Sequence, residues 1–291
     1  SYRWRLIFGY SIYDLLMPQT KPGALIDIDP ERLLDFLLRF ATTQTSVGVQ
    51  TSRIVVNTTR VAHAYGYELT IMMFQRNITM TLMPATSDNT EASHISRAQH
   101  PVTGMIRHRH LPLNFFLNAE LSRLSWYTYD HHPSLEELED RFEAIVTSPP
   151  VNRWLILFLI SLANMAFCFL FGGDLGSGLC VFAGTLCGFF VRQELNARHV
   201  YPYLVICVSA FVASFVVGLG AKLGLEANPE IALGTSVLYL IPGVPFINGM
   251  MDLLDGFMLN GISRLMTAVM IVISITVGLS CTLMMLNLSL L

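Results

Sequence analysis

Charged residues are scarce in this sequence, and the shortage falls mostly on its second half. They make up 13% of the 291 residues, and 53% of the residues are hydrophobic, whereas an average soluble domain has roughly 25% charged residues. Thirteen of the 18 Lys and Arg precede Pro150; the other five are Arg153, Arg192, Arg198, Lys222 and Arg264. With a mean hydropathy of +0.51, the chain is too apolar for an ordinary soluble protein. We predict a polar N-terminal part and a membrane-embedded C-terminal part.

Signals for metal, cofactor and enzymatic chemistry are also missing. The five cysteines contain no CxxC pair, so neither a disulfide framework nor a zinc site is indicated. Nothing resembles a nucleotide-binding loop, a serine nucleophile motif or a nucleic-acid-binding patch. We therefore expect that the protein is not an enzyme and that it binds no cofactor and no metal. Seven of the eight histidines precede residue 150, without metal-ligand spacing, and we expect them on surfaces or interfaces: His63, His94, His100, His108, His110, His131 and His132.

Long apolar runs fill the second part of the chain. Each approaches the ~20 residues that cross a bilayer core, and we predict five transmembrane helices, with a soluble core of buried helices as the alternative. The fourth run contains prolines. The runs cover residues 154–171, 175–191, 203–223, 231–247 and 262–288.

Charge at the ends of these runs predicts their orientation. The first residues do not form a signal peptide, because the apolar run is short and no cleavage site follows, so we expect the N-terminal domain in the cytoplasm. The inner loops then carry four arginines and the outer loops one lysine, as the positive-inside rule requires. An odd number of spans places the C-terminus outside.

The N-terminal part is predicted to be a tail or linker over residues 1–29 and a small cytoplasmic α+β domain over residues 30–150, followed by a transmembrane domain over 151–291. Asp29 before Pro30 is typical of a helix start. Ser134, with Glu137 three residues later, forms a capping box. We expect helices at about 30–44, 50–65, 113–126 and 135–146, and strands at 68–74 and 77–83.

The fourth apolar run is broken by Pro242, Gly243 and Pro245. Proline removes a backbone donor and clashes with the preceding turn, and lipid cannot satisfy the groups that this frees. A half-helix restarting at about residue 246 would place Asn248 and Asp252 on one face, where they could bind a solute or an ion. The alternatives are a structural kink and a cytoplasmic loop that merely carries Asp252.

The segment Leu240-Ile-Pro-Gly-Val-Pro-Phe-Ile-Asn-Gly-Met-Met-Asp252, continued by Asn260-Gly-Ile-Ser-Arg264, resembles the signature of the bacterial threonine/serine exporter family. Three further segments agree: Pro150-Val-Asn-Arg-Trp154, Phe171-Gly-Gly-Asp174 and Val191-Arg-Gln-Glu-Leu-Asn-Ala-Arg-His199. The segment Ser46-Val-Gly-Val-Gln-Thr-Ser-Arg53 is also similar, but Gln50 stands where the family often has Glu. The resemblance covers about residues 30–290.

The resemblance implies a secondary transporter. Split members of the family pair a larger subunit of this length with a small five-span membrane subunit, so this chain is expected to form half of an inverted-repeat transporter, with a higher oligomer as a further possibility. The implied substrates are threonine and serine or a dicarboxylate such as succinate, and the implied membrane is the bacterial cytoplasmic (inner) membrane.

Specific roles are expected for the residues around the break. We assign Asp252 to a proton or an amine and Asn248 to solute hydrogen bonding, with Pro242, Gly243 and Pro245 exposing backbone groups. Arg264 is expected to bind a solute carboxylate or to pair with Asp255. The competing hypotheses are a membrane-anchored scaffold or sensor whose N-terminal domain recruits a partner, and a membrane hydrolase that uses the histidines.

Overall fold

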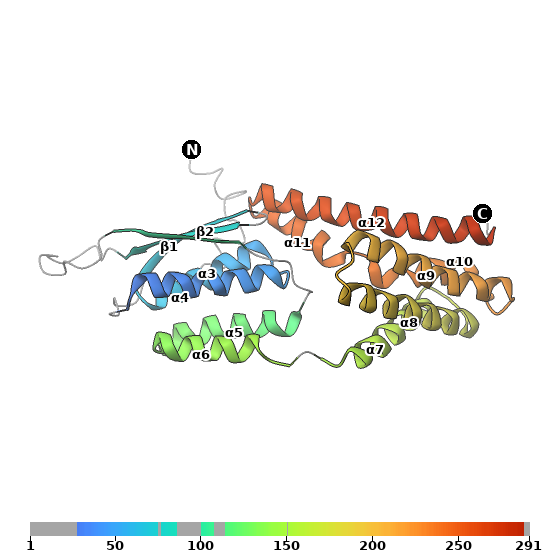
Figure 1. Cartoon of the computed structure of the whole chain (residues 1–291), viewed down its shortest axis with the longest axis horizontal. Helices are drawn as coiled ribbons and strands as arrows, with labels where there is room; N and C mark the ends of the chain where they lie inside the picture. Colours follow the sequence, from blue (N-terminus) through green and yellow to red (C-terminus); the bar gives the residue numbers. More distant parts are fainter. Residues whose placement is uncertain (1–27, 75–76, 86–99, 108–113, 150, 288–291) are drawn as a thin grey trace, which may run out of the picture. The chain divides into compact units, whose positions relative to one another are not determined.

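The computed structural model of the chain describes residues 28–74, 77–85, 100–107, 114–149 and 151–287 (Figure 1). By their contacts the residues form two compact units. The N-terminal unit comprises Ser1–Ser148 together with Val244–Leu265, and the helical unit comprises Pro149–Gly243 together with Met266–Leu291. The division expected from sequence at residue 150 placed 244–265 with the membrane domain, whereas these residues pack with the N-terminal unit.

Two helices form the centre of the N-terminal unit. Helix α3 (Pro30–Ser46) starts as predicted, with the Asp29 side chain accepting a hydrogen bond from the Glu31 amide at 3.1 Å and with proline in the first turn. Helix α4 (Thr51–Ala64) is followed by Gly66, whose φ of 81° is accessible to glycine at little cost. Almost all of α4 is buried, including its polar residues, so the unit is built around it.

A small antiparallel sheet packs beside these helices, with strand order β1-β2-β3. Its strands are β1 (Tyr67–Met73), β2 (Asn77–Pro84) and β3 (Val102–Arg107). In β2, alternate residues point into the core: Ile78, Met80 and Leu82 are buried. Strands β1 and β2 were predicted. Strand β3 was not, because Gly104 interrupts it; a Cβ there would lie 2.8 Å from Cδ1 of Leu38, so glycine lets α3 pack against the strand.

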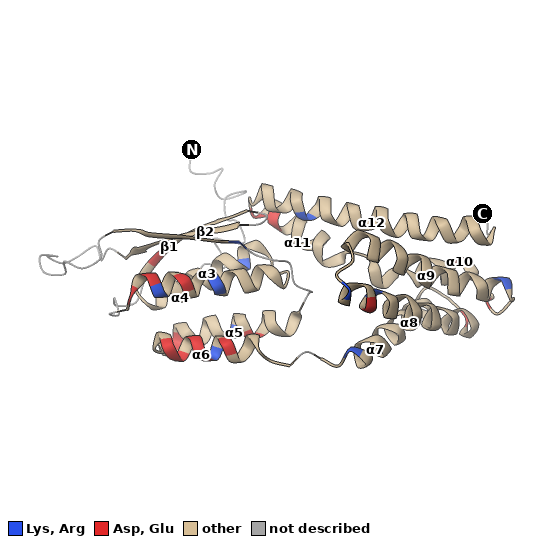
Figure 2. Cartoon of the chain, in the orientation of Figure 1, with Lys and Arg blue, Asp and Glu red and all other residues tan. Residues whose placement is uncertain are grey.

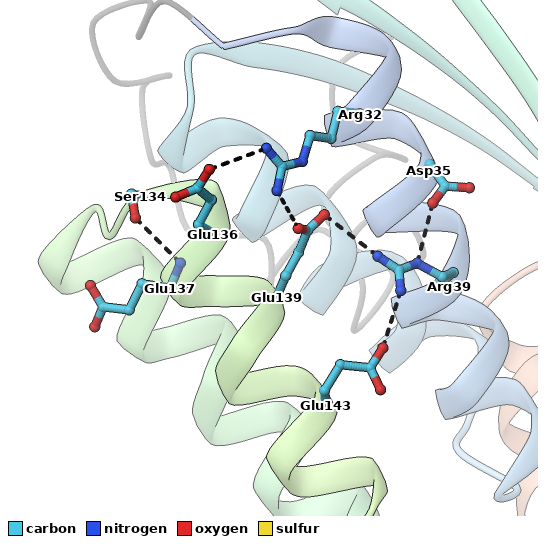
Figure 3. Close-up of polar contacts among 8 residues, drawn as sticks. All are labelled: Arg32, Asp35, Arg39, Ser134, Glu136, Glu137, Glu139 and Glu143. Carbon is cyan, nitrogen blue, oxygen red and sulfur yellow. Dashed lines mark hydrogen bonds and ion pairs between the residues drawn. The ribbon is translucent and has the colours of Figure 1, made fainter.

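Helices α5 (Phe115–His131) and α6 (Leu135–Val146) complete the N-terminal unit. The Ser134 hydroxyl caps α6 by accepting from the Glu137 amide, as predicted (Figure 3). Phe142 of α6 packs edge-on against Phe36 of α3, with ring centroids 5.5 Å apart. Ion pairs between α3 and α6 surround this contact, formed by Arg32 with Glu136 and Glu139, and by Arg39 with Glu139 and Glu143 (Figure 3). Because they are solvent-exposed, these pairs orient the helices more than they stabilise them.

The helical unit consists of long apolar helices. They are α7 (Arg153–Leu170), α8 (Leu175–Ala197), α9 (Pro202–Lys222), α10 (Pro229–Ser236), the 3₁₀ turn η1 (Leu238–Leu240) and, from Met266 onward, α12 (Met258–Leu286). Figure 2 shows charged residues gathered in the N-terminal unit and sparse along α7, α9 and α12. Only 22% of the apolar window of α7 is buried, so most of this helix is an apolar surface suited to lipid or to another membrane helix.

Four of these helices are long and apolar enough to cross a membrane: α7, α8, α9 and α12. They lie where the first, second, third and fifth runs were predicted. The fourth run divides into α10 with η1 and a second helix, α11 (Gly243–Leu254), with a bend of 61° at the break. The described residues therefore include four candidate spans, or five if the bent pair counts as one.

Close packing of α8 on α9 depends on two glycines. An added Cβ on Gly184 would lie 2.7 Å from the carbonyl oxygen of Ala213, and one on Gly188 would lie 2.9 Å from that of Ser209. The same Cβ on Gly188 would lie 2.5 Å from the Tyr239 hydroxyl of η1. Small residues let helix backbones approach in this way, and the GxxxG pattern of residues 184–188 therefore marks a real helix contact.

This contact gives a test by substitution. Gly188→Ala forces a Cβ against backbone and should destabilise the helical unit by ~1–3 kcal/mol, as overpacking usually does. Gly234 of α10 has nothing within 4 Å of an added Cβ, so Gly234→Ala should leave stability unchanged or raise it by about 0.5–1 kcal/mol. The measurement is thermal unfolding of the detergent-solubilised chain; equal shifts for the two variants would contradict the packing described.

Candidate functional site

Polar side chains of α11 lie against the turn that joins α3 to α4. Asn248 and Asp252 are one helical turn apart, on the face predicted from sequence. The Asn248 side-chain amide donates to the Gly48 carbonyl at 2.8 Å. The Asp252 carboxylate accepts hydrogen bonds from the Thr51 amide at 3.0 Å and from the Thr51 hydroxyl at 2.9 Å. The start of α4 and the middle of α11, 200 residues apart in sequence, thus form one polar cluster within the N-terminal unit.

Asp252 performs the task of a helix cap for α4. Gln50, the residue before the helix, makes no side-chain capping bond, and the first amides of a helix have no partner within it. The Asp252 carboxylate binds the first of them and places a negative charge at the positive end of the helix. The Asp252 side chain is completely buried, so protein donors take the place of water around its carboxylate.

Arg264, in the first part of α12, balances that charge. Its Nε lies 3.2 Å from Oδ2 of Asp252, and its Nη2 donates to the Val49 carbonyl at 2.8 Å. The alternative expectation that Arg264 pairs with Asp255 was wrong, because Asp255 instead accepts from the Gln50 side-chain amide at 2.9 Å. Gln50 suits this place because its amide can donate to a carboxylate, which an ionised Glu cannot do.

Two glycines bring α11 close enough to α12 for this pairing. An added Cβ on Gly261 would lie 2.8 Å from the Gly249 carbonyl oxygen, and one on Gly249 would lie 3.0 Å from Leu265. Between the helices, Gly256 has a φ of 88°, a conformation that favours glycine. The hairpin of α11 and α12 therefore holds Asp252 and Arg264 side by side.

Pro242, Gly243 and Pro245 form the break and the first turn of α11, which starts three residues earlier than expected. Tyr239, just before the break, donates from its hydroxyl to the Ser209 carbonyl at 3.4 Å. Ser209 lies seven residues into α9, or ~10 Å from its first residue. The Tyr239 hydroxyl therefore lies about two turns into α9 from its N-terminal end.

Three of the six sequence-predicted residues are thus brought together, and their polar atoms bond to protein groups. Asn248, Asp252 and Arg264 converge, and residues 48–51 of the N-terminal unit engage their polar atoms. In the sequence, only the family resemblance marks residues 46–53. It did not predict that Thr51 would bind Asp252, since neither residue carries a local signal for a contact so distant in sequence.

No metal cluster accompanies this site in the part of the chain that the structure describes. Of the histidines, His94, His108 and His110 lie outside the described residues. The Nδ1–H of His132 donates to the Ala64 carbonyl, and that of His131 donates to the Tyr127 carbonyl. Both therefore have local structural partners.

Comparison with known proteins places this arrangement in a family. The family model described as "Putative threonine/serine exporter" matches residues 35–286. The chain belongs to this family. The match covers α4, α11 and Arg264, so the polar cluster lies in its matched region. No solved structure matches the chain.

Three relatives of the exporter family are informative. The "Probable succinate transporter subunit YjjP" of Escherichia coli (strain K12) is 30% identical over 169 residues, 57% of this chain and 65% of that protein. The protein of the same name from Klebsiella aerogenes is 31% identical over 146 residues, 49% and 55% of the two chains. The "Probable threonine/serine exporter" of Mycobacterium tuberculosis is 24% identical over 259 residues, 88% and 46%. The matched part of the chain thus covers 65%, 55% and 46% of the lengths of these three relatives, which is less than two thirds in each case.

Removal of the central carboxylate tests the role of the cluster. Asp252→Ala leaves the Arg264 charge and the first amides of α4 without their partner, and should destabilise the N-terminal unit by ~3–5 kcal/mol, as loss of one member of a buried ion pair does. Asp255→Ala is the matched control, because Asp255 is only partly buried and its loss should cost less than ~1 kcal/mol. Thermal unfolding and limited proteolysis of the solubilised chain measure both; an Asp252 variant as stable as the control would refute this role.

Proposed function

We propose that this chain is a subunit of a secondary transporter that exports a small carboxylate-bearing solute across the bacterial cytoplasmic membrane. Family membership supports export, and the candidate spans support a membrane location. The relatives named above are a succinate transporter subunit and a threonine/serine exporter, so the solute class is threonine and serine or a dicarboxylate such as succinate. The chain acts as a transporter without enzymatic chemistry of its own.

One observation carries the proposal: a buried ion pair, Asp252 with Arg264, follows a break in an apolar helical segment. Broken helices in membrane proteins commonly mark solute pathways, and the ion pair follows such a break closely in sequence. The guanidinium of Arg264 can bind a solute carboxylate, Asn248 can bond to its polar groups, and Asp252 can receive an amine. The break at Pro242, Gly243 and Pro245 supplies backbone groups at the start of α11.

The contact with residues 48–51 corresponds, in this proposal, to a closed state. Asn248, Asp252 and Arg264 cannot bind a solute with the atoms that now bond to Gly48, Val49 and Thr51. Solute binding therefore requires this turn to withdraw from α11. With the N-terminal unit in the cytoplasm, as the charge distribution predicts, this withdrawal would expose the cluster on the side from which an exporter takes up its solute.

A second membrane subunit is part of the proposal. Two of the relatives are named as transporter subunits, and a chain with five spans can pair with a second five-span chain of opposite orientation. The partner is therefore a small membrane protein of the same family, and the solute path lies in the complex.

Efflux from cells tests this function. Cells producing the chain with a small membrane subunit of the same family, loaded with labelled succinate, threonine or serine, should release one of these faster than cells producing either chain alone. Asp252→Asn should lower this efflux by about tenfold or more, since it removes a charge from the binding group. Asp255→Asn, at equal membrane abundance, should stay near wild type.

Efflux that no chain combination accelerates would contradict the proposal. The scaffold hypothesis predicts a different pattern: Pro242→Ala and Asp252→Asn leave solute flux unchanged, while deletion of residues 1–145 abolishes partner binding.

A further inference from the structure

Glu226 is a buried carboxylate that the site described above does not use. It lies in the turn between α9 and α10. The flanking charged residues, Lys222 at the end of α9 and Glu230 at the start of α10, are exposed, whereas Glu226 is turned inward. Both of its carboxylate oxygens are buried, and among the described residues the weak Cys180 thiol is the one side-chain donor beside them. Asp252, by contrast, is bonded by Thr51 and Arg264. The two carboxylates therefore differ in what their surroundings supply.

The Glu226 carboxylate lies beside Gly220 of α9 and Cys180 of α8. An added Cβ on Gly220 of α9 would lie 2.7 Å from Oε1 of Glu226 and 2.6 Å from Sγ of Cys180. The carboxylate thus lies against the glycine surface of α9, beside the Cys180 thiol of α8. A thiol is only a weak donor, so this pocket offers little to stabilise a negative charge.

Asp174, at the start of α8, is the charged neighbour. It accepts from the Gly176 amide at 3.0 Å, the Ala227 amide at 3.2 Å and the Ser177 hydroxyl. These bonds, chiefly that from Ser177, lower the pKa of Asp174, so it stays ionised. Because Ala227 is held in this way, the turn that carries Glu226 is anchored and its side chain is directed into the pocket.

Burial without donors favours the neutral form of a carboxyl group. Burial is the main factor that raises the pKa of Glu226; the negative charge of Asp174 adds to it, and the Cys180 thiol opposes it. The pair resembles other sites in which two carboxylates with different environments have separated pKa values, one ionised and one protonated.

We propose that Glu226 is the proton-binding carboxylate of the transporter. This inference rests on the proposed function of solute export. One proton from the solution adds to the carboxylate, and the resulting neutral carboxyl group occupies the pocket between α8 and α9; the proton leaves when the group ionises. In the predicted orientation the turn of residues 223–228 faces outward, the side from which protons enter a bacterial cell. Asp252, already neutralised by Arg264, is the less suitable proton carrier.

The test is the dependence of efflux on external pH, measured for the complex of this chain with its small membrane subunit. Wild-type efflux should be greatest at acidic external pH and fall as pH rises through the pKa of Glu226, because the protonated fraction drops about tenfold per pH unit above the pKa. Glu226→Gln, which mimics the protonated group, should retain downhill solute exchange but lose this pH dependence. The matched control is Glu230→Gln, which removes an exposed carboxylate from the same part of the chain and should behave as wild type.

A second variant distinguishes the loss of the Glu226 carboxylate from misfolding of the Glu226→Gln protein. Gly220→Ala displaces the carboxylate from its pocket while keeping it, so the fall in efflux should move to lower external pH. An unchanged pH profile in Glu226→Gln and Gly220→Ala, or a wild-type profile that does not depend on pH, would overturn the role of Glu226 while leaving the export function intact. Absence of efflux from the wild-type complex would instead overturn the export function.

Discussion

The buried carboxylate of Asp252 is the interaction on which the arrangement of the N-terminal unit depends. It caps α4, pairs with Arg264 and thereby fixes the α11–α12 hairpin to the turn of residues 48–51. Removing a charge from water is costly unless all of its partners are present. The cluster therefore exists as a whole or not at all, and the close approach of α11 to α12 at Gly249 and Gly261 is what makes it possible.

This dependence connects stability to transport. In the proposed exporter, the groups that stabilise the closed arrangement are those that a solute would bind, so the protein's own carboxylate and carbonyl groups compete with the solute for the same donors. A contact of this kind can be strong without trapping the transporter, because solute binding replaces the bonds that opening removes. In the same proposal, the proton-binding carboxylate Glu226 lies in the helical unit beside Asp174, whereas the solute-binding groups surround Asp252 in the N-terminal unit, so proton binding and solute binding use different groups.

Local features of the sequence predicted much of this structure. The caps at Asp29 and Ser134, strands β1 and β2, the four long apolar helices and the break at residue 242 all follow from patterns within one or two turns of chain. The contact of Asp252 with Thr51 could not be predicted from the sequence, because no pattern or spacing relates two residues so far apart. Strand β3 was missed because glycine is a poor strand former, and Gly104 is explained only by the packing of the strand against Leu38.

Amide hydrogen exchange of the wild-type complex in membranes, with and without saturating solute, tests most directly whether solute binding releases the turn of residues 48–51. The account predicts that the amides at the start of α4, from Thr51 to Ile54, exchange faster with solute present, while the amides of α3 keep their protection. Protection of the α4 start that is unchanged or increased by a transported solute would contradict it.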